Sequence, residues 1–472
     1  MTNTIPLAIP ALLLATAAFA VVDGGIPAKN ASDVKTVKVN ADTAGKSPAV
    51  ISGLDIIPAK GGVKVTAGKC KIGGKVVTVK TDTILPVAHG DAVTVVDEPI
   101  KVPVCEPSGY WNGARLKGPD GNDTNCQFAY NSGTAVLRKE PGGKPLVLGK
   151  DFTVSDPFAL LGLTADSAAS PDETLYVSYI YSLLRIDSVF VTPEGKIALA
   201  KGKPSVNLPE QPKAKPGCLR LANIYIPYRS VSVKPEDIYP VVEGADKAKT
   251  LSRQGNLAKT MAKIKSGQPV TIVCWGDSVT QGGNASTPDM VYVKVFERML
   301  KAKFPKADIT VINESVGGSS SLNWLRPDKY PFQGNGFCDF EQRVAVHNPD
   351  LVTMEFVNDS GYTPEMLDEA YTDIKARMDR LGAEYILITP HFTTPYWMGF
   401  DDMRAAKENR SYVFYALDWA EKNGYGIADA SSRWAHLGKE GIPYITLLGN
   451  TLNHPNDYGH NIFAEELMKC FK

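Results

Sequence analysis

The segment TIVCWGDSVTQGG, from Thr271 to Gly283, decides the fold of the C-terminal half of this chain. Its apolar residues predict a short buried strand, and the chain then turns sharply at Gly-Asp-Ser. A serine at the end of such a strand, Ser278, lies at the carboxyl edge of a sheet, where open α/β proteins place their sites. We therefore expect the Ser278 hydroxyl to face a functional cleft.

Strands and helices alternate on both sides of this segment, from Asp246 to Lys472. A helix is expected over residues 246–267, ending at Gly267, and the first strand follows it. Four further strands are expected in ADITVIN, LVTMEFV, EYILITP and GIADAS, each separated from the next by a helical pattern. Such alternation with short loops predicts a parallel sheet flanked by helices.

The first half of the chain has a different pattern. Residues 23–103 alternate Val, Ile and Thr with Lys and Gly, which predicts a small antiparallel β domain. A second β-rich domain is expected over residues 104–240, with more aromatic residues. The Pro/Lys-rich stretch at 200–217 is interpreted as a long hairpin loop or a linker.

The N-terminal residues 1–22 resemble a signal peptide. An apolar run from Ala11 to Val22 is too short to span a bilayer, and Ala18-Phe19-Ala20 suits cleavage. This favours a secreted or periplasmic protein with no membrane insertion after cleavage, although no Lys or Arg precedes the run. The alternative is an apolar N-terminal strand or arm.

The composition of the chain argues against several classes of binding partner. The chain has 51 basic and 51 acidic residues, so no overall field favours nucleic acid or an anionic membrane. Its seven cysteines form no C-x-x-C pair and no Cys/His cluster, which argues against a zinc site. Export would permit a disulfide among Cys70, Cys105 and Cys126, and Cys274 is expected to be a buried thiol.

Two segments after later strands offer groups that could stabilise an oxyanion. In NESVGG, Gly318 would let the backbone approach a substrate and donate an N–H; the alternative is an ordinary turn glycine. In FVND, the Asn358 amide could donate to an oxyanion, or it could simply close an Asx turn. The backbone N–H of Ser278 itself, at a helix start, is a third donor, although a serine there also suits an N-cap.

A base is needed because a serine hydroxyl is a poor nucleophile until an imidazole takes its proton. The segment NHPNDYGH contains two of the six histidines, His454 and His460, in a loop that enters the last helix. His454 precedes a rigid Pro-Asn pair, whereas His460 fits the start of the helix.

At these residues the chain from about 246 to 472 resembles the SGNH (GDSL-like) hydrolase superfamily. The blocks GDSVTQG, NESVGG, FVND and NHPND occur in the family's order. The resemblance implies a flavodoxin-like three-layer α/β/α domain that hydrolyses esters without a metal or cofactor. It implies Ser278 as nucleophile, His454 as base, and Gly318 and Asn358 as oxyanion donors.

The chain departs from the family's pattern at two positions. Thr451 stands where the family usually has an Asp three residues before its histidine, and Phe356 replaces a Gly in the third block. The literal D-x-x-H is Asp457 to His460. The group that orients His454 therefore stays open: a backbone carbonyl, no group at all, Asp457 or an Asp from elsewhere.

These observations predict a serine esterase whose substrate is an ester, with O-acetyl or short acyl groups on a polysaccharide favoured. The alternatives are a carbohydrate-binding or phage-tail/adhesin-like protein with a degenerate hydrolase domain, and a lipid-acting esterase. Five aromatic residues of the first half could stack on sugar rings, but core or cross-strand packing is the more common role of such residues. They are Tyr110, Trp111, Tyr130, Tyr179 and Tyr181. In the second half, Trp324, Tyr396 and Trp397 could line a groove or equally be core residues.

Overall fold

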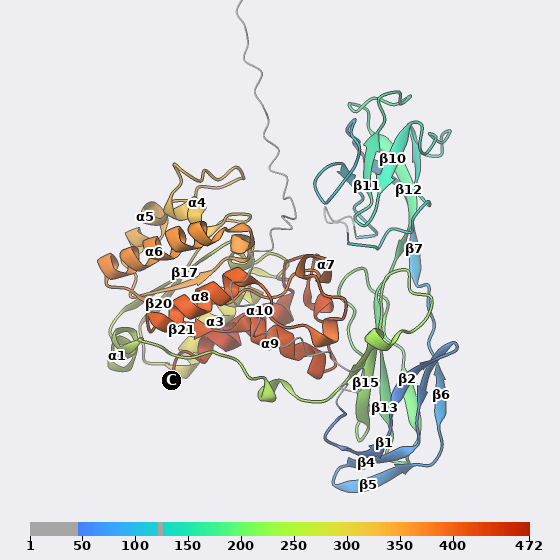
Figure 1. Cartoon of the computed structure of the whole chain (residues 1–472), viewed down its shortest axis with the longest axis horizontal. Coiled ribbons are helices and arrows are strands. Elements are labelled where there is room, and N and C mark those ends of the chain that lie inside the picture. The colour runs from blue at the N-terminus through green and yellow to red at the C-terminus, as the bar shows by residue number, and fades with distance from the viewer. Residues whose placement is uncertain (1–45, 121–125) are drawn as a thin grey trace, which may run out of the picture. The chain divides into compact units, whose positions relative to one another are not determined.

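The computed structural model describes residues 46–120 and 126–472 (Figure 1). The predicted signal peptide and residues 23–45 of the predicted first β domain lie outside these residues. None of the helices in the described ranges combines the length and the hydropathy that a membrane span requires. All seven cysteines are free thiols, and Cys274 is buried as expected.

Five parallel strands form the sheet of the C-terminal domain, in the order β18-β17-β19-β20-β21. Counted along the chain this order is 2-1-3-4-5, the flavodoxin-like arrangement, so the predicted fold class is confirmed. The strands are β17 (Val270–Gly276), β18 (Ile309–Ser315), β19 (Leu351–Glu355), β20 (Glu384–Ile388) and β21 (Gly426–Ala428).

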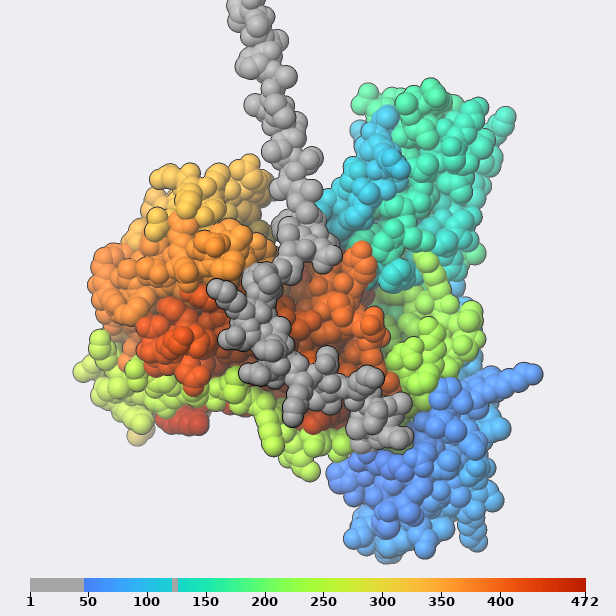
Figure 2. All heavy atoms as spheres, viewed as in Figure 1, coloured from blue at the N-terminus to red at the C-terminus, as the bar shows by residue number. Residues whose placement is uncertain are grey.

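The central strand β17 is buried on both faces. Ile272 and Cys274 pack into one hydrophobic cluster, while Val273 and Trp275 point the other way into a second. Helices α1, α3, α9 and α10 contribute to the first cluster and α4, α6 and α8 to the second, which makes three layers. In the space-filling view of Figure 2, orange and red side chains of this domain fill the space between the ribbons of Figure 1.

The helices of this domain are α1 (Ala258–Ser266), α2 (Ser278–Gln281), α3 (Tyr292–Lys303), α4 (Ser321–Leu325), α5 (Phe340–Arg343), α6 (Pro364–Leu381), α7 (Pro395–Met398), α8 (Ser411–Lys422), α9 (Ala430–His436) and α10 (Asp457–Met468). The helix predicted over residues 246–267 is longer than the observed helix, α1. Gly255 has φ +58°, and Arg253 forms a bridge with Ile427 of β21 through two backbone hydrogen bonds. The segment before α1 is therefore extended along the sheet edge.

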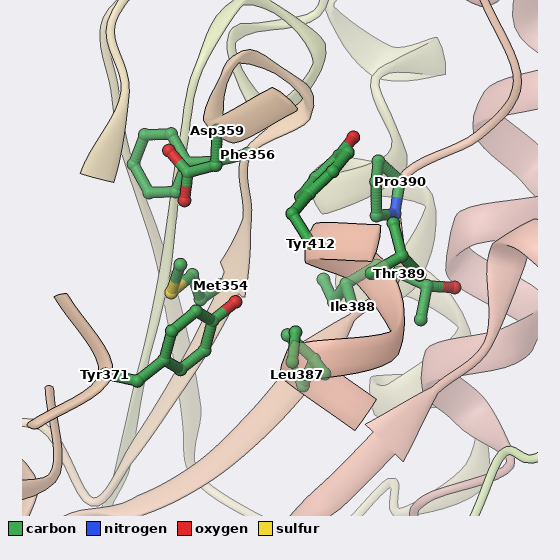
Figure 3. A pocket seen from close by; sticks show the side chains of 11 residues that line it. Met354, Phe356, Asp359, Tyr371, Leu387, Ile388, Thr389, Pro390 and Tyr412 are labelled. Atoms are coloured by element: carbon green, nitrogen blue, oxygen red, sulfur yellow. The ribbon is translucent and has the colours of Figure 1, made fainter. Parts of the chain in front are cut away.

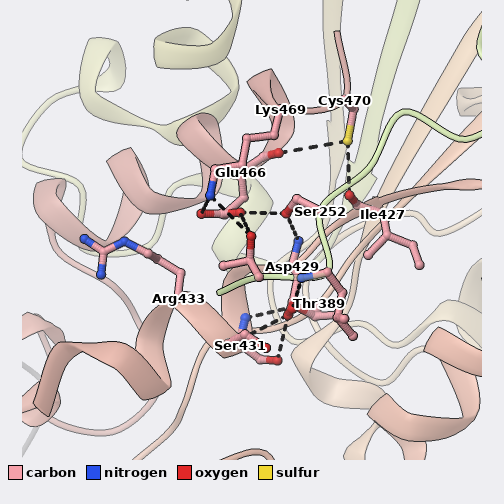
Figure 4. A network of polar contacts seen from close by, with 12 residues as sticks. Ser252, Thr389, Ile427, Asp429, Ser431, Arg433, Glu466, Lys469 and Cys470 are labelled. Atoms are coloured by element: carbon pink, nitrogen blue, oxygen red, sulfur yellow. Dashed lines mark hydrogen bonds and ion pairs between the residues drawn. The ribbon is translucent and has the colours of Figure 1, made fainter. Parts of the chain in front are cut away.

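A buried polar network fixes the last strand to the last helix (Figure 4). The Ser252 hydroxyl donates to Glu466 of α10 at 2.6 Å and accepts from the Asp429 N–H at 2.7 Å. The Asp429 carboxylate accepts from the Thr389 hydroxyl and caps α9 by accepting from Ser432 N–H. Through Ser252, helix α10, which follows the His454 loop, is thus linked to Asp429 at the end of β21.

The first half of the described chain is rich in β structure, as predicted, and its strand pairs are antiparallel. Its sheets are β1-β4-β5, β2-β3-β6, β7-β12-β9, β10-β11-β8 and β14-β13-β15-β16. The strands are β1 (Val50–Gly53), β2 (Ile56–Ala59), β3 (Gly62–Val65), β4 (Gly68–Ile72), β5 (Lys75–Val79), β6 (Thr83–Pro86), β7 (Ala92–Ile100), β8 (Ala114–Arg115), β9 (Val136–Arg138), β10 (Phe152–Ser155), β11 (Leu160–Leu163), β12 (Leu175–Ser182), β13 (Arg185–Val191), β14 (Ile197–Ala200), β15 (Leu219–Ile226) and β16 (Ile238–Pro240).

Two hydrophobic clusters organise these strands. One joins side chains from residues 54–87 with side chains from residues 189–238, and the other lies within residues 100–181. The first cluster therefore combines segments that lie before and after the second cluster in the sequence. The predicted boundary near residue 103, by contrast, divides the chain into two consecutive segments. The boundaries of independent domains stay a prediction.

Candidate active site

Ser278 is the first residue of the four-residue helix α2, directly after β17. Asp277 caps this helix: its carboxylate accepts from the Val279 N–H at 3.0 Å and from the Asn358 N–H at 3.2 Å. Gly276 is required before it, because a Cβ there would lie 2.0 Å from the Thr280 hydroxyl and 2.5 Å from the Glu355 carbonyl oxygen. The Asp277 carboxylate therefore links the turn at Ser278 to the segment that carries Asn358.

His454 lies next to this serine. Its Nε2 is 2.9 Å from the Ser278 Oγ, although the two residues are separated by 176 positions in the chain. A Cβ on Gly283 would lie 2.9 Å from the Cγ and Nδ1 atoms of the His454 ring. Only glycine at position 283 lets the imidazole pack against the backbone that follows the serine.

The other ring nitrogen of His454 faces an amide. Asn284 Oδ1 lies 3.1 Å from His454 Nδ1. An amide oxygen only accepts, so Nδ1 carries the proton and Nε2 is left to accept from the Ser278 hydroxyl. The orienting group is thus a side-chain amide, which none of the alternatives from the sequence included.

Asn284 was missed because it lies six residues after Ser278, far from the position at which the family places its Asp. Its φ is +59°, a left-handed conformation that Asn tolerates better than most residues. The Gly-Gly-Asn run after Ser278 was the available signal, since such runs favour left-handed turns.

Asp457 does not contact His454. Its carboxylate accepts from the Ser286 N–H at 2.7 Å and from the Ser286 hydroxyl at 2.6 Å. Asp457 therefore anchors the loop that carries Asn284.

His460 is fully buried and forms a hydrogen bond with the same loop. Its Nδ1 accepts from the Tyr292 N–H at 3.3 Å, so its Nε2–H donates to the Gly283 carbonyl, also at 3.3 Å. Burial lowers the pKa of His460 to about 4, which keeps the ring neutral. Both ring nitrogens are occupied, and the structure places this histidine behind the serine loop and not at the Ser278 hydroxyl.

The loop before His454 is organised by another asparagine. Asn450 Oδ1 accepts from the N–H groups of Leu452, Asn453 and His454 at 3.0, 2.9 and 2.9 Å. Thr451, at the family's Asp position, is buried with φ +55°. Three amides held by one side-chain oxygen fix the direction in which His454 leaves the loop.

The expected oxyanion donors lie around the same serine. Gly318 has φ +82°, and a Cβ on its neighbour Gly317 would lie 3.5 Å from the Ser278 Cβ, so this segment passes beside the serine. Among the described residues, neither the Ser278 N–H nor the Gly318 N–H donates to another group. The Asn358 side-chain amide donates to the Ser319 carbonyl at 3.1 Å, which leaves its second N–H available.

Three acidic side chains are buried beneath this turn: Asp277, Glu355 and Asp359. Burial raises the pKa of Asp277 and of Asp359 to about 7, although both accept backbone hydrogen bonds. Neither oxygen of Glu355 has a hydrogen-bond partner in the described chain, and burial raises its pKa well above the usual range. Asp277 and Asp359 thus hold backbone N–H groups of the loops around Ser278 from the interior of the domain.

Asp359 borders a small cavity at the carboxyl ends of β19 and β20 (Figure 3). Its volume is about 10 Å³, near the least that one water molecule needs. Phe356 and Asp359 lie on one side of it and Tyr412 and Pro390 on the other. A cavity of this size and depth is a packing space and not a substrate site.

The aromatic candidates divide by exposure. Trp324 is a core residue, as are Tyr130, Tyr179 and Tyr181, which confirms the packing interpretation for these four. Tyr396 and Trp397 on α7, by contrast, are 60% and 44% exposed. The helix α7 begins beside the His454 loop, because Thr394 N–H donates to the Leu452 carbonyl at 2.5 Å.

Desolvation of the ring lowers the pKa of His454 to about 4. Among the described residues no carboxylate forms a hydrogen bond or an ion pair with the ring, whose partners are Asn284 and Ser278. Among the described residues, no group of three or more His, Cys, Asp or Glu side chains is arranged to hold a metal ion.

Parts of the chain are similar to known proteins. Residues 274–462 match the model of the GDSL-like Lipase/Acylhydrolase family, and residues 151–253 match a domain of unknown function, DUF4815. The C-terminal domain is therefore a GDSL-like acylhydrolase domain. No curated protein sequence matches the chain.

Among solved structures, a two-domain esterase (CEX) active on acetylated mannans is 22% identical, with a TM-score of 0.38. The match covers 47% of this chain and 53% of that one, so the chain spans about half the length of this esterase. Axe2, an acetylxylan esterase from Geobacillus stearothermophilus, is 21% identical over 44% of this chain and 96% of that one, with a TM-score of 0.33.

Proposed function

We propose that the GDSL-like domain hydrolyses carboxylic esters through an acyl-enzyme on Ser278, and that its substrates are O-acetyl or short acyl esters of carbohydrate. The observation that carries the proposal is the 2.9 Å separation between Ser278 Oγ and His454 Nε2, with the Nδ1 proton held by Asn284. A hydroxyl that donates to a neutral imidazole is ready to lose its proton as it attacks.

In the first step, Ser278 Oγ attacks the ester carbonyl while its proton moves to His454 Nε2. The N–H groups of Ser278 and Gly318 and the amide of Asn358 stabilise the oxyanion, each worth about 3 kcal/mol of barrier. The imidazolium then gives its proton to the departing alcohol, which leaves an acyl-serine. A water molecule attacks the acyl group with His454 again as base, and the acid and free Ser278 are released.

Asn284 takes the position of an acidic residue in this scheme. A neutral amide fixes the tautomer and the direction of the ring but does not add a negative charge beside it. The imidazolium that forms during reaction is thus less stabilised than in a triad with a carboxylate. The gain is a base that stays neutral, and hence active, in acid solution.

The carbohydrate part of the proposal is supported by the exposed rings of Tyr396 and Trp397 on α7, beside the His454 loop. Flat aromatic faces suit the C–H faces of sugar rings, which bury apolar area against them. A long acyl chain would instead need a deep apolar groove.

The test is a series of p-nitrophenyl esters of increasing acyl length, run beside acetylated xylan and acetylated mannan. We expect the highest kcat/KM for acetyl and release of acetate from a polysaccharide. Ser278→Ala should abolish turnover, while Ser266→Ala, which changes an exposed serine outside the site, should not alter it. Equal turnover by the Ser278→Ala variant would contradict the mechanism, and a preference for long chains would contradict the substrate class.

A further inference from the structure

A polar groove of about 560 Å³ lies in the β-rich half of the chain, within residues 99–174. It is lined by the end of β7 with the next residue, Lys101, and by Ala114 and Arg115 of β8. Each of these strands is the edge strand of its own sheet, since β7 pairs with β12 alone and β8 with β11 alone. An edge strand presents backbone N–H and carbonyl groups that a polar ligand can reach.

Three cations line this groove: Lys101, Arg115 and Lys117. In residues 46–120 and 126–472, none of the three forms an ion pair. The nearest buried acid, Glu98, is directed inward, where it accepts from the Lys117 N–H at 2.9 Å and from the Tyr179 hydroxyl at 2.6 Å. Asp97 and Glu173, which lie beside the lining segments, pair with Arg138 and Lys139. Among the described residues no acidic side chain lines the groove, so its lining is positive on a chain whose total charge is zero.

An exposed indole adjoins the groove. The tight loop Ser108–Asn112 closes with two backbone hydrogen bonds and carries Tyr110 and Trp111 at its tip. The Arg115 guanidinium lies over both rings, 4.9 Å from the Tyr110 centroid and 5.1 Å from that of Trp111. Trp111 is nonetheless 68% exposed. The Arg115 Nη1–H also donates to the Tyr110 hydroxyl at 3.1 Å. These contacts hold the guanidinium in place, while its Nε and Nη2 groups have no hydrogen-bond partner among the described residues and can contact a ligand together with the indole.

Glycine makes this arrangement possible. Gly113 connects the aromatic loop to β8 with φ +138°, and a Cβ there would lie 2.9 Å from Leu160 and 3.0 Å from the Leu161 carbonyl oxygen. The loop can therefore reach the groove only because the chain passes close to β11 at this point.

We propose that this groove binds an acidic polysaccharide, with uronate carboxylates at Lys101, Arg115 and Lys117 and a sugar ring against Trp111. Arginine pairs with a planar carboxylate through two parallel N–H donors, and the lysines add point charges. An open groove with polar walls and one exposed ring suits a hydrated chain of sugars better than a folded protein surface, which would need a larger apolar core. Three cations are also few for a nucleic acid, whose binding depends on many phosphate contacts.

This inference deepens the proposed function by giving the esterified polysaccharide a negative charge, but the groove is separate in sequence from the Ser278 domain. Binding is therefore measured with the full chain carrying Ser278→Ala, so that no turnover is required. Failure of the esterase proposal would leave this test unaffected.

The experiment compares three probes by affinity electrophoresis and calorimetry: polygalacturonate, its fully methyl-esterified form and dextran sulfate. We expect binding to polygalacturonate that weakens as salt is raised, and binding to the neutral methyl ester at least about tenfold weaker. Dextran sulfate should bind no tighter than polygalacturonate, because it lacks the planar carboxylates.

Variants locate the binding. The triple change Lys101→Gln, Arg115→Gln and Lys117→Gln should weaken binding of polygalacturonate by at least about tenfold. Trp111→Ala should weaken it several-fold without changing its salt dependence. The matched control changes three exposed lysines of the β4–β5 hairpin, Lys69→Gln, Lys71→Gln and Lys75→Gln, and should bind like the parent.

Each alternative outcome overturns the proposal. Absence of binding at low salt, or equal loss in the triple variant and the lysine control, would remove the groove as the site. Tighter binding to dextran sulfate than to polygalacturonate would show a site for any polyanion. Circular dichroism of the triple variant distinguishes lost binding from lost folding, and Trp111→Ala, at an exposed position, tests the site independently of the charges.

Discussion

The Nδ1 atom of His454 lies 3.1 Å from the side-chain oxygen of Asn284, on the loop that directly follows the proposed nucleophile. The residue that faces the His454 ring is thus carried by the same turn that presents Ser278. Asp457 and His460 hold this turn from the other side. The chemistry of the site therefore depends on one short segment, residues 276–286.

Substitution of Asn284 tests its role in orienting His454. Asn284→Ala should lower kcat/KM for p-nitrophenyl acetate by roughly ten- to a hundredfold, because the ring loses the partner that fixes its tautomer. Asn284→Asp should keep much of the activity. An unchanged rate in Asn284→Ala would show that the ring needs no such partner.

The pH dependence of the rate follows from the burial of His454. Its pKa is lowered to about 4, and the base works only when neutral, so activity should be constant above that pH and fall below it. The negative charge in Asn284→Asp favours the imidazolium, so the acid limb of the kcat/KM profile should move to higher pH. A wild-type midpoint near 6.5, or no shift in the variant, would contradict this explanation.

Gly283→Ala tests the close approach of the imidazole to the backbone. A Cβ at this position would overlap the His454 ring, so the ring must move away from Ser278. We expect at least a tenfold loss of kcat with little change in KM, since geometry within ~1 Å controls the proton transfer. Gly361→Ala is the control, because a Cβ there meets nothing within 4 Å. Similar rates in both variants would show that a side chain at position 283 does not move the His454 ring away from Ser278.

Asp457→Ala separates anchoring from catalysis. Because its carboxylate contacts Ser286 and not His454, we expect a loss of less than about tenfold in kcat/KM and an unchanged pH profile. Complete loss of turnover in a folded variant would instead assign Asp457 to the catalytic set.

Much of this arrangement could be predicted from sequence, and the missing part has a physical cause. Ser278, Gly318 and Asn358 stand in short blocks just after strands β17, β18 and β19, and parallel strands bring such ends to one edge. His454 stands in a fourth block, in the loop that enters α10. Asn284 and Asn450 are different, because each acts through a side-chain oxygen in an irregular loop. No periodicity marks such a residue, and its partner is set by how two distant loops pack.

The same reason explains the error at residues 246–257. Their composition suits a helix, but Arg253 finds its hydrogen bonds on Ile427 of β21, more than 170 positions later. A tertiary partner of this kind overrides local propensity. The central strands, which are buried and strongly apolar, carried no such ambiguity.

Glu355 provides a test of the buried acids through stability. Its pKa is raised by burial, so the folded state binds its proton more tightly than the unfolded state does. Stability from this group is therefore present below the unfolded pKa near 4 and is lost as pH rises through the folded value. Glu355→Gln should accordingly be more stable than wild type at pH 8, by about 1–2 kcal/mol, with a smaller difference at pH 6.

Urea unfolding of both proteins at the same pH provides the measurement. The pairwise comparison is needed because two histidines with lowered pKa values, His454 and His460, act in the opposite direction below pH 6.5. A variant less stable than wild type at pH 8 would mean that the carboxylate is satisfied when charged.

The most direct measurement of the central claim is intact-mass analysis after reaction with a fluorophosphonate, which labels a serine only when a base has activated it. One adduct should form on wild-type protein and map to Ser278, labelling should be absent in Ser278→Ala, and it should be slowed by at least about a hundredfold in His454→Ala. An adduct on another residue, or equal labelling rates in wild type and His454→Ala, would contradict the assignment of these two residues as nucleophile and base.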